Sequence, residues 1–231
     1  MKTIGLLGGM SWVSSAEYYR LLNERVRDRL GEYRSAKCVL YSVDFADIEV
    51  LQIEDRWADA AKVLGEAARD VQAAGADLLL ICSNTMHKVA DEVQAAVDIP
   101  LVHLADTTAQ AIVASGLTKV GLLGTAYTME QDYYRDRLAR HGLEVIVPDR
   151  EDRAEVHRVI FDELVQGMVK PDSREVYQGV IRRLAVAGAQ GVILGCTEIE
   201  LLIKAEDSAL PVFPTTQLHV DAAVELALED V

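Results

Sequence analysis

The chain has 231 residues, 50% of them apolar and 26% charged, which is typical of a globular protein with a sizeable core. Its formal net charge of −14 repels nucleic acid and anionic membrane surfaces, so we expect neither as a partner. No apolar run approaches the roughly 20 residues that span a bilayer. Residues 1–4 begin a strand without a signal-peptide pattern, so we expect a cytoplasmic protein.

Short apolar runs alternate with amphipathic segments along the chain, and this alternation predicts parallel α/β structure. Strands are expected at residues 3–8, 38–45, 78–83, 101–104, 119–124, 144–148, 191–196 and 211–213. Helices are expected at residues 16–30, 55–74, 88–97, 107–115, 129–141, 153–166, 173–187 and 217–228. Short sequence motifs around Gly5, Ser83 and Ile99 recur in the same order about half a chain later, which favours two similar domains.

The glycines that end the first strand are a weak signal by themselves. Gly5, Gly8 and Gly9 do not follow the G-x-G-x-x-G order of a dinucleotide-binding turn. They could offer backbone N–H groups to an anion at a helix start, or they could simply allow a tight turn.

Two apolar runs, at residues 78–82 and 191–195, stop abruptly at small polar or nucleophilic residues. The carboxyl edge of a parallel sheet is where ligands bind in α/β proteins, so Ser83 and Cys196 are placed to meet a ligand. In a duplicated fold they could act on opposite sides of one ligand. Two proton-handling groups on opposite faces are what inversion at a carbon atom requires.

The three cysteines have neither disulfide-framework nor metal-site spacing, which fits a reducing compartment. Cys38 is expected to be a small buried apolar residue, and Cys82 could be the same. Cys196 differs because it lies at a predicted strand end between Gly195 and Thr197. No phosphate-loop or metal-ligand spacing appears in the sequence, so we expect no metal, pyridoxal phosphate or nicotinamide cofactor. His87, the nearest candidate ligand, lies at a helix start and is expected to be structural.

Four motifs resemble those of the aspartate/glutamate racemase family, and together they extend over essentially the whole chain. They are Ile-Gly-Leu-Leu-Gly-Gly-Met-Ser-Trp at 4–12, Ser-Asn-Thr-Met-His at 83–87, Gly-Thr-Ala-Tyr-Thr-Met-Glu at 124–130 and Gly-Cys-Thr-Glu at 195–198. The resemblance implies a cofactor-independent amino-acid racemase, forming a homodimer or a larger homo-oligomer. It also implies two pseudo-symmetric parallel-sheet α/β domains facing each other across a cleft, residues 1–98 plus 210–231 and residues 99–209.

In this family the substrate lies between a cysteine from each half, and the present sequence departs from that pattern at one place. Ser83 occupies the position of the first cysteine, while Cys82 is one residue early and should point to the other face of its strand. Ser83 resembles a branch of the family that has threonine here and prefers L-aspartate and L-glutamate. The resemblance makes Cys196 the base on the L face and Ser83 the proton donor, so the D direction should be slow.

The expected substrate-binding residues lie in or beside these motifs: Gly9, Met10, Gln52, Asn84, Thr85, Thr125, Tyr127, Thr128, Thr197 and Glu198. Asn84, Thr85 and Thr197 could hold a carboxylate through side-chain and backbone donors, or could only cap helices. Gln52 is a possible reader of the distal carboxylate, because no Arg or Lys occurs between Asp44 and Arg56. The alternatives are a single-thiol decarboxylase or isomerase of small dicarboxylates, and a catalytically silent homologue that binds a carboxylate.

Overall fold

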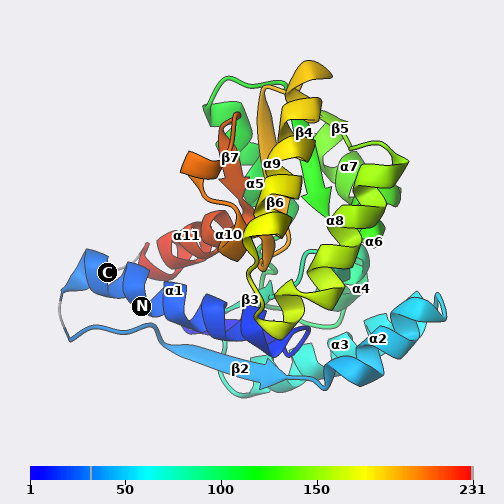
Figure 1. Cartoon of the computed structure of the whole chain (residues 1–231). Coiled ribbons are helices and arrows are strands. Elements are labelled where there is room, and N and C mark those ends of the chain that lie inside the picture. Colours follow the sequence, from blue (N-terminus) through cyan, green and yellow to red (C-terminus); the bar gives the residue numbers. More distant parts are fainter. Residues whose placement is uncertain (32, 230–231) are drawn as a thin grey trace. The chain divides into compact units, whose positions relative to one another are not determined.

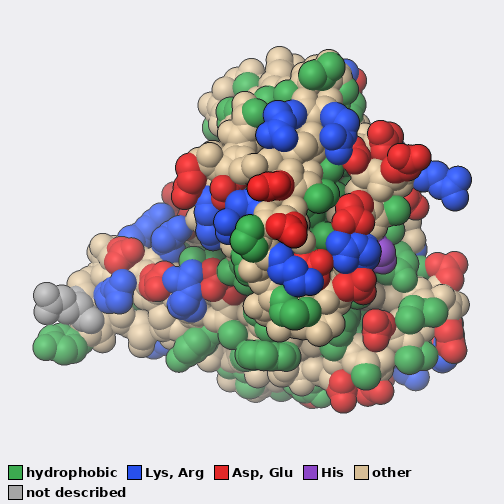
Figure 2. All heavy atoms as spheres, in the orientation of Figure 1, with side chains coloured by type: hydrophobic (Ala, Val, Ile, Leu, Met, Phe, Trp, Pro, Cys, Tyr) green, Lys and Arg blue, Asp and Glu red, His purple; other side chains and the backbone are tan. Residues whose placement is uncertain are grey.

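The computed structural model describes residues 1–31 and 33–229, and the chain divides into two compact units (Figure 1). Unit 1 consists of Met1–Leu104 with His219–Val231, and unit 2 of Ala105–Leu218. Each contains a parallel sheet flanked by helices, so the predicted α/β class is confirmed. None of the described helices has the length and apolar character to cross a membrane. Charged side chains of both signs lie interspersed with apolar ones on the face shown in Figure 2.

The sheet of unit 1 has the strand order β2-β1-β3, so that β1 lies at its centre. Its strands are β1 (Ile4–Gly8), β2 (Cys38–Ser42) and β3 (Leu78–Ile81). Its helical segments are α1 (Trp12–Leu30), α2 (Phe45–Ile53), α3 (Trp57–Ala73), the 3₁₀ turn η1 (Thr85–Val89), α4 (Ala90–Ala95) and most of α11 (Thr215–Leu228). Strands β1 and β3 are buried throughout, whereas β2 is half exposed, as expected of an edge strand.

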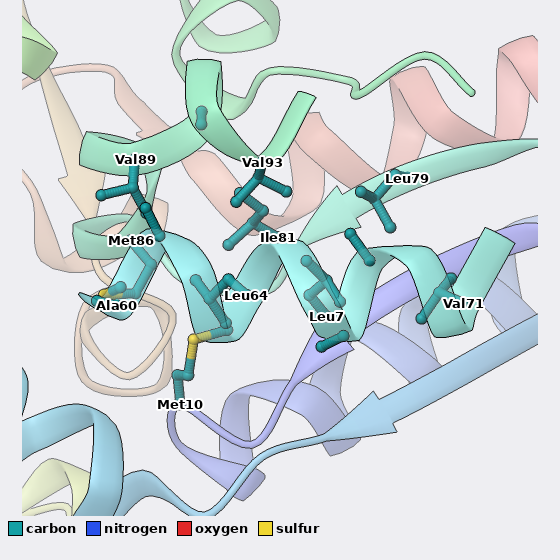
Figure 3. Packing of buried hydrophobic residues seen from close by; sticks show 14 of the residues in the cluster. Leu7, Met10, Ala60, Leu64, Val71, Leu79, Ile81, Met86, Val89 and Val93 are labelled. Carbon is teal, nitrogen blue, oxygen red and sulfur yellow. The ribbon is translucent and has the colours of Figure 1, made fainter. Parts of the chain in front are cut away.

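The core of unit 1 has two parts because alternate strand residues point to opposite faces of the sheet. Leu7 and Ile81 pack with Leu64 of α3 and Val93 of α4 on one face (Figure 3). A second cluster on the other face includes Leu6, Leu80 and Cys82, together with residues of α1 and α11. Cys82 therefore points into the core, and burial raises the pKa of its thiol.

The sheet of unit 2 has the strand order β5-β4-β6-β7. Its strands are β4 (Lys119–Gly124), β5 (Glu144–Ile146), β6 (Gly191–Gly195) and β7 (Val212–Pro214). Its helical segments are α5 (Leu104–Ala114), α6 (Ala126–Glu130), α7 (Asp132–Ala139), α8 (Arg150–Asp162), η2 (Leu164–Gln166), α9 (Pro171–Val186), α10 (Ile199–Leu202), η3 (Ala205–Asp207) and the start of α11.

Two glycines let β4 and β6 approach closely where both strands end. A Cβ on Gly195 would lie 2.7 Å from the Leu123 carbonyl oxygen, and one on Gly124 would lie 3.0 Å from the Gly195 carbonyl oxygen. Both positions therefore require a residue without a side chain. The residues that follow, Thr125 and Cys196, are consequently placed at neighbouring points of one sheet edge.

Some element bounds differ from the sequence predictions for local reasons. The predicted strand 101–104 forms only a bridge between Leu79 and Leu101, because α5 already begins at Leu104. The predicted helix 129–141 is divided at Gln131 into α6 and α7, and it starts earlier because the Thr125 hydroxyl accepts a hydrogen bond from the Thr128 N–H.

The two compact units change over at Leu104/Ala105 and Leu218/His219. The predicted domains meet at 98/99 and 209/210, so residues 99–104 lie in unit 1 and residues 210–218 in unit 2. The reason is strand pairing, since Leu101 bridges to β3 while β7 pairs with β6. Residues 32 and 230–231, which belong to the predicted first domain, lie outside the described residues.

Candidate active site

Ser83 lies immediately after β3, at the carboxyl edge of the unit 1 sheet. Its hydroxyl is partly exposed, and its Oγ accepts a hydrogen bond from the Met86 N–H at 3.3 Å. This contact orients the side chain and leaves its O–H able to donate. Asn84 and Thr85, which follow, are buried at the start of η1.

The buried imidazole of His87 holds the Ser83 backbone in place. Its Nδ1 lies 2.7 Å from the Ser83 carbonyl oxygen, and its Nε2 lies 3.2 Å from the Leu104 nitrogen. A carbonyl can only accept and an amide N–H can only donate, so the ring is neutral with its proton on Nδ1. His87 is therefore a structural residue, as the sequence predicts.

Gly9 forms a tight turn at the end of β1. It has a φ of +92°, and a Cβ there would collide with the backbone of Val43. Its N–H donates to the Ser15 Oγ at 2.8 Å and is thereby committed within the protein. Of the two readings that the sequence left open for these glycines, the geometry favours the tight turn.

Met10 and Gln52 lie in the interior of unit 1. Met10 packs into the core cluster around Leu64 (Figure 3). The Gln52 side chain is buried on α2, and its Nε2 donates to the Met86 Sδ at 3.0 Å. Both therefore support the segment that carries Ser83.

Cys196 follows β6 at the carboxyl edge of the unit 2 sheet, and its partly buried thiol has a carboxylate partner. The Cys196 Sγ donates to the Glu198 Oε2 at 3.0 Å, and Glu198 itself is buried. Burial of the thiol, together with the nearby Glu198 charge, raises the pKa of Cys196 well above its ordinary value. The resting residue is a neutral thiol with a proton acceptor in contact.

The β4 end contributes a buried row of hydroxyl groups. The Thr125 Oγ1 lies 3.2 Å from the Thr128 Oγ1, which in turn lies 3.2 Å from the Tyr133 hydroxyl. Burial raises the pKa of Tyr133, so this phenol is neutral. The three hydroxyl groups of this row are therefore neutral, and they can donate and accept hydrogen bonds without carrying a charge.

Tyr127 is held beside His157 at the start of α6. The two rings meet edge to face with centroids 6.4 Å apart, and the His157 Nδ1 accepts a hydrogen bond from the Ala126 N–H at 3.1 Å. Burial lowers the pKa of His157, so the ring is a neutral acceptor near pH 7. Sequence reasoning missed His157, because no motif surrounds it.

A second missed contact ties the start of α11 to the segment after β6. The Thr216 hydroxyl donates to the Thr197 Oγ1 at 3.1 Å, and the Thr216 N–H donates to the Glu200 Oε1 at 2.7 Å. The Thr197 hydroxyl thus has a structural partner in addition to its predicted role. The only signal in the sequence was the pair of threonines after Pro214.

The predicted site residues therefore fall into one set in each unit. Unit 1 carries Gly9, Met10, Gln52, Ser83, Asn84 and Thr85, and unit 2 carries Thr125, Tyr127, Thr128, Cys196, Thr197 and Glu198. Among residues 1–31 and 33–229, no group of three or more His, Cys, Asp or Glu side chains is arranged to hold a metal ion.

A thiol with a carboxylate partner at a strand end is an arrangement that can transfer a proton. The sequence family described as Asp/Glu/hydantoin racemase matches residues 7–223. The chain belongs to this family, and the prediction of an enzyme that isomerises amino acids is confirmed at that level.

Individual relatives agree with this assignment. A crystal structure of a putative Asp/Glu racemase from Yersinia pestis is 52% identical, with a TM-score of 0.92 over 99% of this chain and 100% of that one. An aspartate racemase homologue from Pyrococcus horikoshii OT3 is 38% identical, with a TM-score of 0.87 over 99% and 100%. The broad specificity amino-acid racemase RacX from Bacillus subtilis (strain 168) is 23% identical over 72% of each chain.

Proposed function

We propose that the protein racemises acidic amino acids, with a preference for L-aspartate or L-glutamate, by cofactor-independent proton transfer at Cα. Cys196 is the base that removes the α-proton of the L enantiomer. Ser83 donates a proton to the opposite face of the resulting carbanion. The observation that carries the proposal is the 3.0 Å contact between the Cys196 thiol and the Glu198 carboxylate.

The Glu198 contact answers the main difficulty of a thiol base. With an ordinary pKa of about 8.5, ionising a thiol at pH 7 costs about 2 kcal/mol, and here burial makes the cost larger. Glu198 accepts the Sγ proton, and the thiolate then takes the α-proton. The thiol is thereby restored, and the negative charge passes to the substrate carbon. We therefore assign Glu198 to the activation of Cys196.

Ser83 makes the two directions unequal. Its Oγ contacts the Met86 N–H, and its carbonyl, not its hydroxyl, meets His87. A hydroxyl without a base beside it can donate a proton to a carbanion but is a poor base near neutrality. After donating, it regains a proton from solvent, and Glu198 returns to solvent the proton that it took from Cys196, so both residues end in their starting protonation states. The D enantiomer, which needs Ser83 as the base, should therefore react slowly.

The same observation favours a second candidate, a single-thiol enzyme that decarboxylates or isomerises small dicarboxylates. Such an enzyme protonates one face only, and Cys196 alone would suffice. The substrate would then be a malonate or a maleate, without an amino group.

Hydrogen exchange in deuterated water tests the proposal. Each enantiomer of aspartate and glutamate is incubated with the enzyme, α-deuteration is followed by NMR, and inversion is followed by chiral chromatography. Exchange of an L enantiomer much faster than of its D partner is expected. Equal exchange of both would contradict the assigned role of Ser83. Turnover of malonate or maleate without any amino-acid exchange would instead establish the second candidate.

A carboxylate-binding homologue without activity is separated by the same assay. Aspartate or glutamate would stabilise such a protein against thermal unfolding, but none of these compounds would undergo hydrogen exchange. Dialysis against EDTA before the assay checks the expected independence from metal ions.

A further inference from the structure

His157 lies on α8 and contacts the start of α6, at the carboxyl edge of the unit 2 sheet. Helices α6 and α8 lie side by side (Figure 1). The His157 Nδ1 accepts from the Ala126 N–H at 3.1 Å, and Ala126 directly follows Thr125. Strand β4 pairs with β6, so Thr125 and Cys196 follow neighbouring strands. The His157 imidazole therefore lies at the edge that carries the proposed base.

The Ala126 contact determines which ring nitrogen of His157 carries the proton. A backbone N–H can only donate, so Nδ1 is the acceptor and the hydrogen of the neutral ring is on Nε2. Burial lowers the pKa of His157, which favours this neutral form. In the part of the chain that the structure describes, no group accepts from the Nε2–H. The half-buried ring thus has one structural nitrogen and one that is available to a ligand.

Two of the first backbone N–H groups of α6 are already engaged within the protein. The Ala126 N–H is bound by His157, and the Thr128 N–H donates to the Thr125 Oγ1 at 3.3 Å. His157 accepts at one side of its ring and can donate at the other. Because hydrogen bonds in a chain polarise one another, the Ala126 contact makes the Nε2–H a better donor. This N–H is therefore suited to an anion.

The positive charges of α8 next to His157 are engaged with carboxylates. The Arg153 Nε donates to the Glu130 Oε1 at 2.9 Å. The Arg158 Nε donates to the Glu155 Oε2 at 3.0 Å. An anionic group that reaches this part of the edge therefore meets the neutral imidazole N–H as its available donor.

We propose that the His157 Nε2–H binds the side-chain carboxylate of the acidic substrate, which makes His157 a specificity-determining residue. This role rests on the proposed function, in which Cys196 acts at Cα. The edge runs from Cys196 through Thr125 to His157, so a substrate whose Cα meets the thiol can extend its side chain toward the imidazole. Gln52, which the sequence suggested for this carboxylate, is buried in unit 1 with its amide on the Met86 Sδ.

Two substitutions separate the roles of the two ring nitrogens. His157→Asn places an amide oxygen near the Nδ1 position, so it keeps the acceptor for the Ala126 N–H and loses the outer donor. His157→Gln places an amide nitrogen near the Nε2 position, so it keeps the outer donor and loses the acceptor. The kcat and KM for α-hydrogen exchange of L-aspartate and L-glutamate are measured for both variants, together with their stability in urea.

Loss of the outer donor should appear mainly in KM. A hydrogen bond to a charged group corresponds to about 10- to 100-fold in affinity, so His157→Asn should raise KM by that factor and change kcat less. His157→Gln should raise KM less but lower the stability more. Phe161→Leu is the control for packing, since it removes a ring 4.7 Å from that of His157 and keeps both nitrogens. An unchanged KM in His157→Asn, or a tenfold rise in Phe161→Leu, would overturn the proposal.

A binding measurement without turnover separates this role from racemase activity. The imidazole NMR signals of His157, assigned by their loss in His157→Asn, are titrated with pH in the absence and presence of L-aspartate. A carboxylate on Nε2 favours the charged ring, so the pKa of His157 should rise. Glu130 and Asp162 act on the ring in both titrations, so their contributions cancel. A raised pKa without exchange of any amino acid would support the His157 role and contradict the racemase. Exchange without a change in pKa or KM would contradict the His157 role alone.

Discussion

The ends of β3 and β6 occupy corresponding places in the two units, yet their surroundings differ in kind. At the end of β3, the Ser83 hydroxyl meets a backbone N–H, and the nearby His87 clamps backbone groups. At the end of β6, the Cys196 thiol meets the Glu198 carboxylate. In unit 1 the turn after the strand therefore orients the Ser83 side chain, whereas in unit 2 the corresponding turn places a proton acceptor beside the Cys196 side chain. A repeated fold therefore does not imply repeated chemistry.

The buried ionisable groups of the two units differ in the same way. In unit 1 the buried His219 is neutral, with its Nε2 2.7 Å from the Val102 carbonyl and its Nδ1 2.8 Å from the Tyr18 hydroxyl. In unit 2 the buried Glu163 stays charged, because the Ser173 hydroxyl and the Arg158 guanidinium lower its pKa. Protonation therefore begins to cost stability below about pH 6.5 for His219, but only below about pH 4.3 for Glu163.

Removal of the thiol should have the largest effect. Cys196→Ala takes away the thiol that is proposed to remove the α-proton, so turnover should fall by about 10⁴-fold. Chiral chromatography after long incubation measures it. Cys82→Ala and Cys38→Ala are controls that should keep most activity, since Cys82 is buried in the core. If Cys82→Ala were equally inactive, the assignment of the site position to Ser83 would be wrong.

The next largest effect on the rates is expected when a cysteine is placed at the end of β3, as it already is at the end of β6. Ser83→Cys supplies a second thiol, and the D direction should become about 10²- to 10⁴-fold faster, the range of general acid–base effects. The L direction should change less, because Cys196 is still its base. Initial rates from each enantiomer measure the ratio. An unchanged ratio would mean that Ser83 does not face the reacting carbon.

Glu198→Gln distinguishes activation of the thiol from binding of the substrate. If Glu198 takes the Cys196 proton, kcat should fall by about 10²-fold near neutrality and recover as the pH rises and the thiol ionises unaided. If Glu198 only binds substrate, KM should rise with kcat unchanged. The pH profiles of kcat and KM for the variant and the unmodified enzyme decide between them.

Acid should lower the stability of the folded chain through protonation of His219, and this is the smallest of the four predicted effects. Burial, with a contribution from His87, lowers the pKa of His219 to about 3, from about 6.5 in the unfolded chain. Below pH 6.5 only the unfolded chain binds this proton, so stability falls as the pH drops toward 3. The loss is about 1.4 kcal/mol per pH unit. Urea unfolding at pH 7 and 5 should show a smaller loss for His219→Gln, and equal losses would contradict this.

Local patterns in the sequence predicted most of the fold and the location of the candidate site. Apolar runs that end at Ser83 and Cys196 identified the two sheet edges, and strand alternation placed Cys82 in the core, where it is found. The wrong strand at 101–104 shows the limit of such patterns. A short apolar run is compatible with a strand or with a helix start, and Leu104 begins α5.

The sequence by itself determined the α/β class, the family motifs and the two residues that end β3 and β6, because these depend on neighbours a few positions apart. Only the tertiary structure decided what surrounds them. The clamp of His87 on Leu104, the contacts of His219 with Val102 and Tyr18, and the position of β2 at a sheet edge all join segments far apart in the chain. Such contacts depend on which strands pair and which helices cover them, and no spacing within a single motif encodes that.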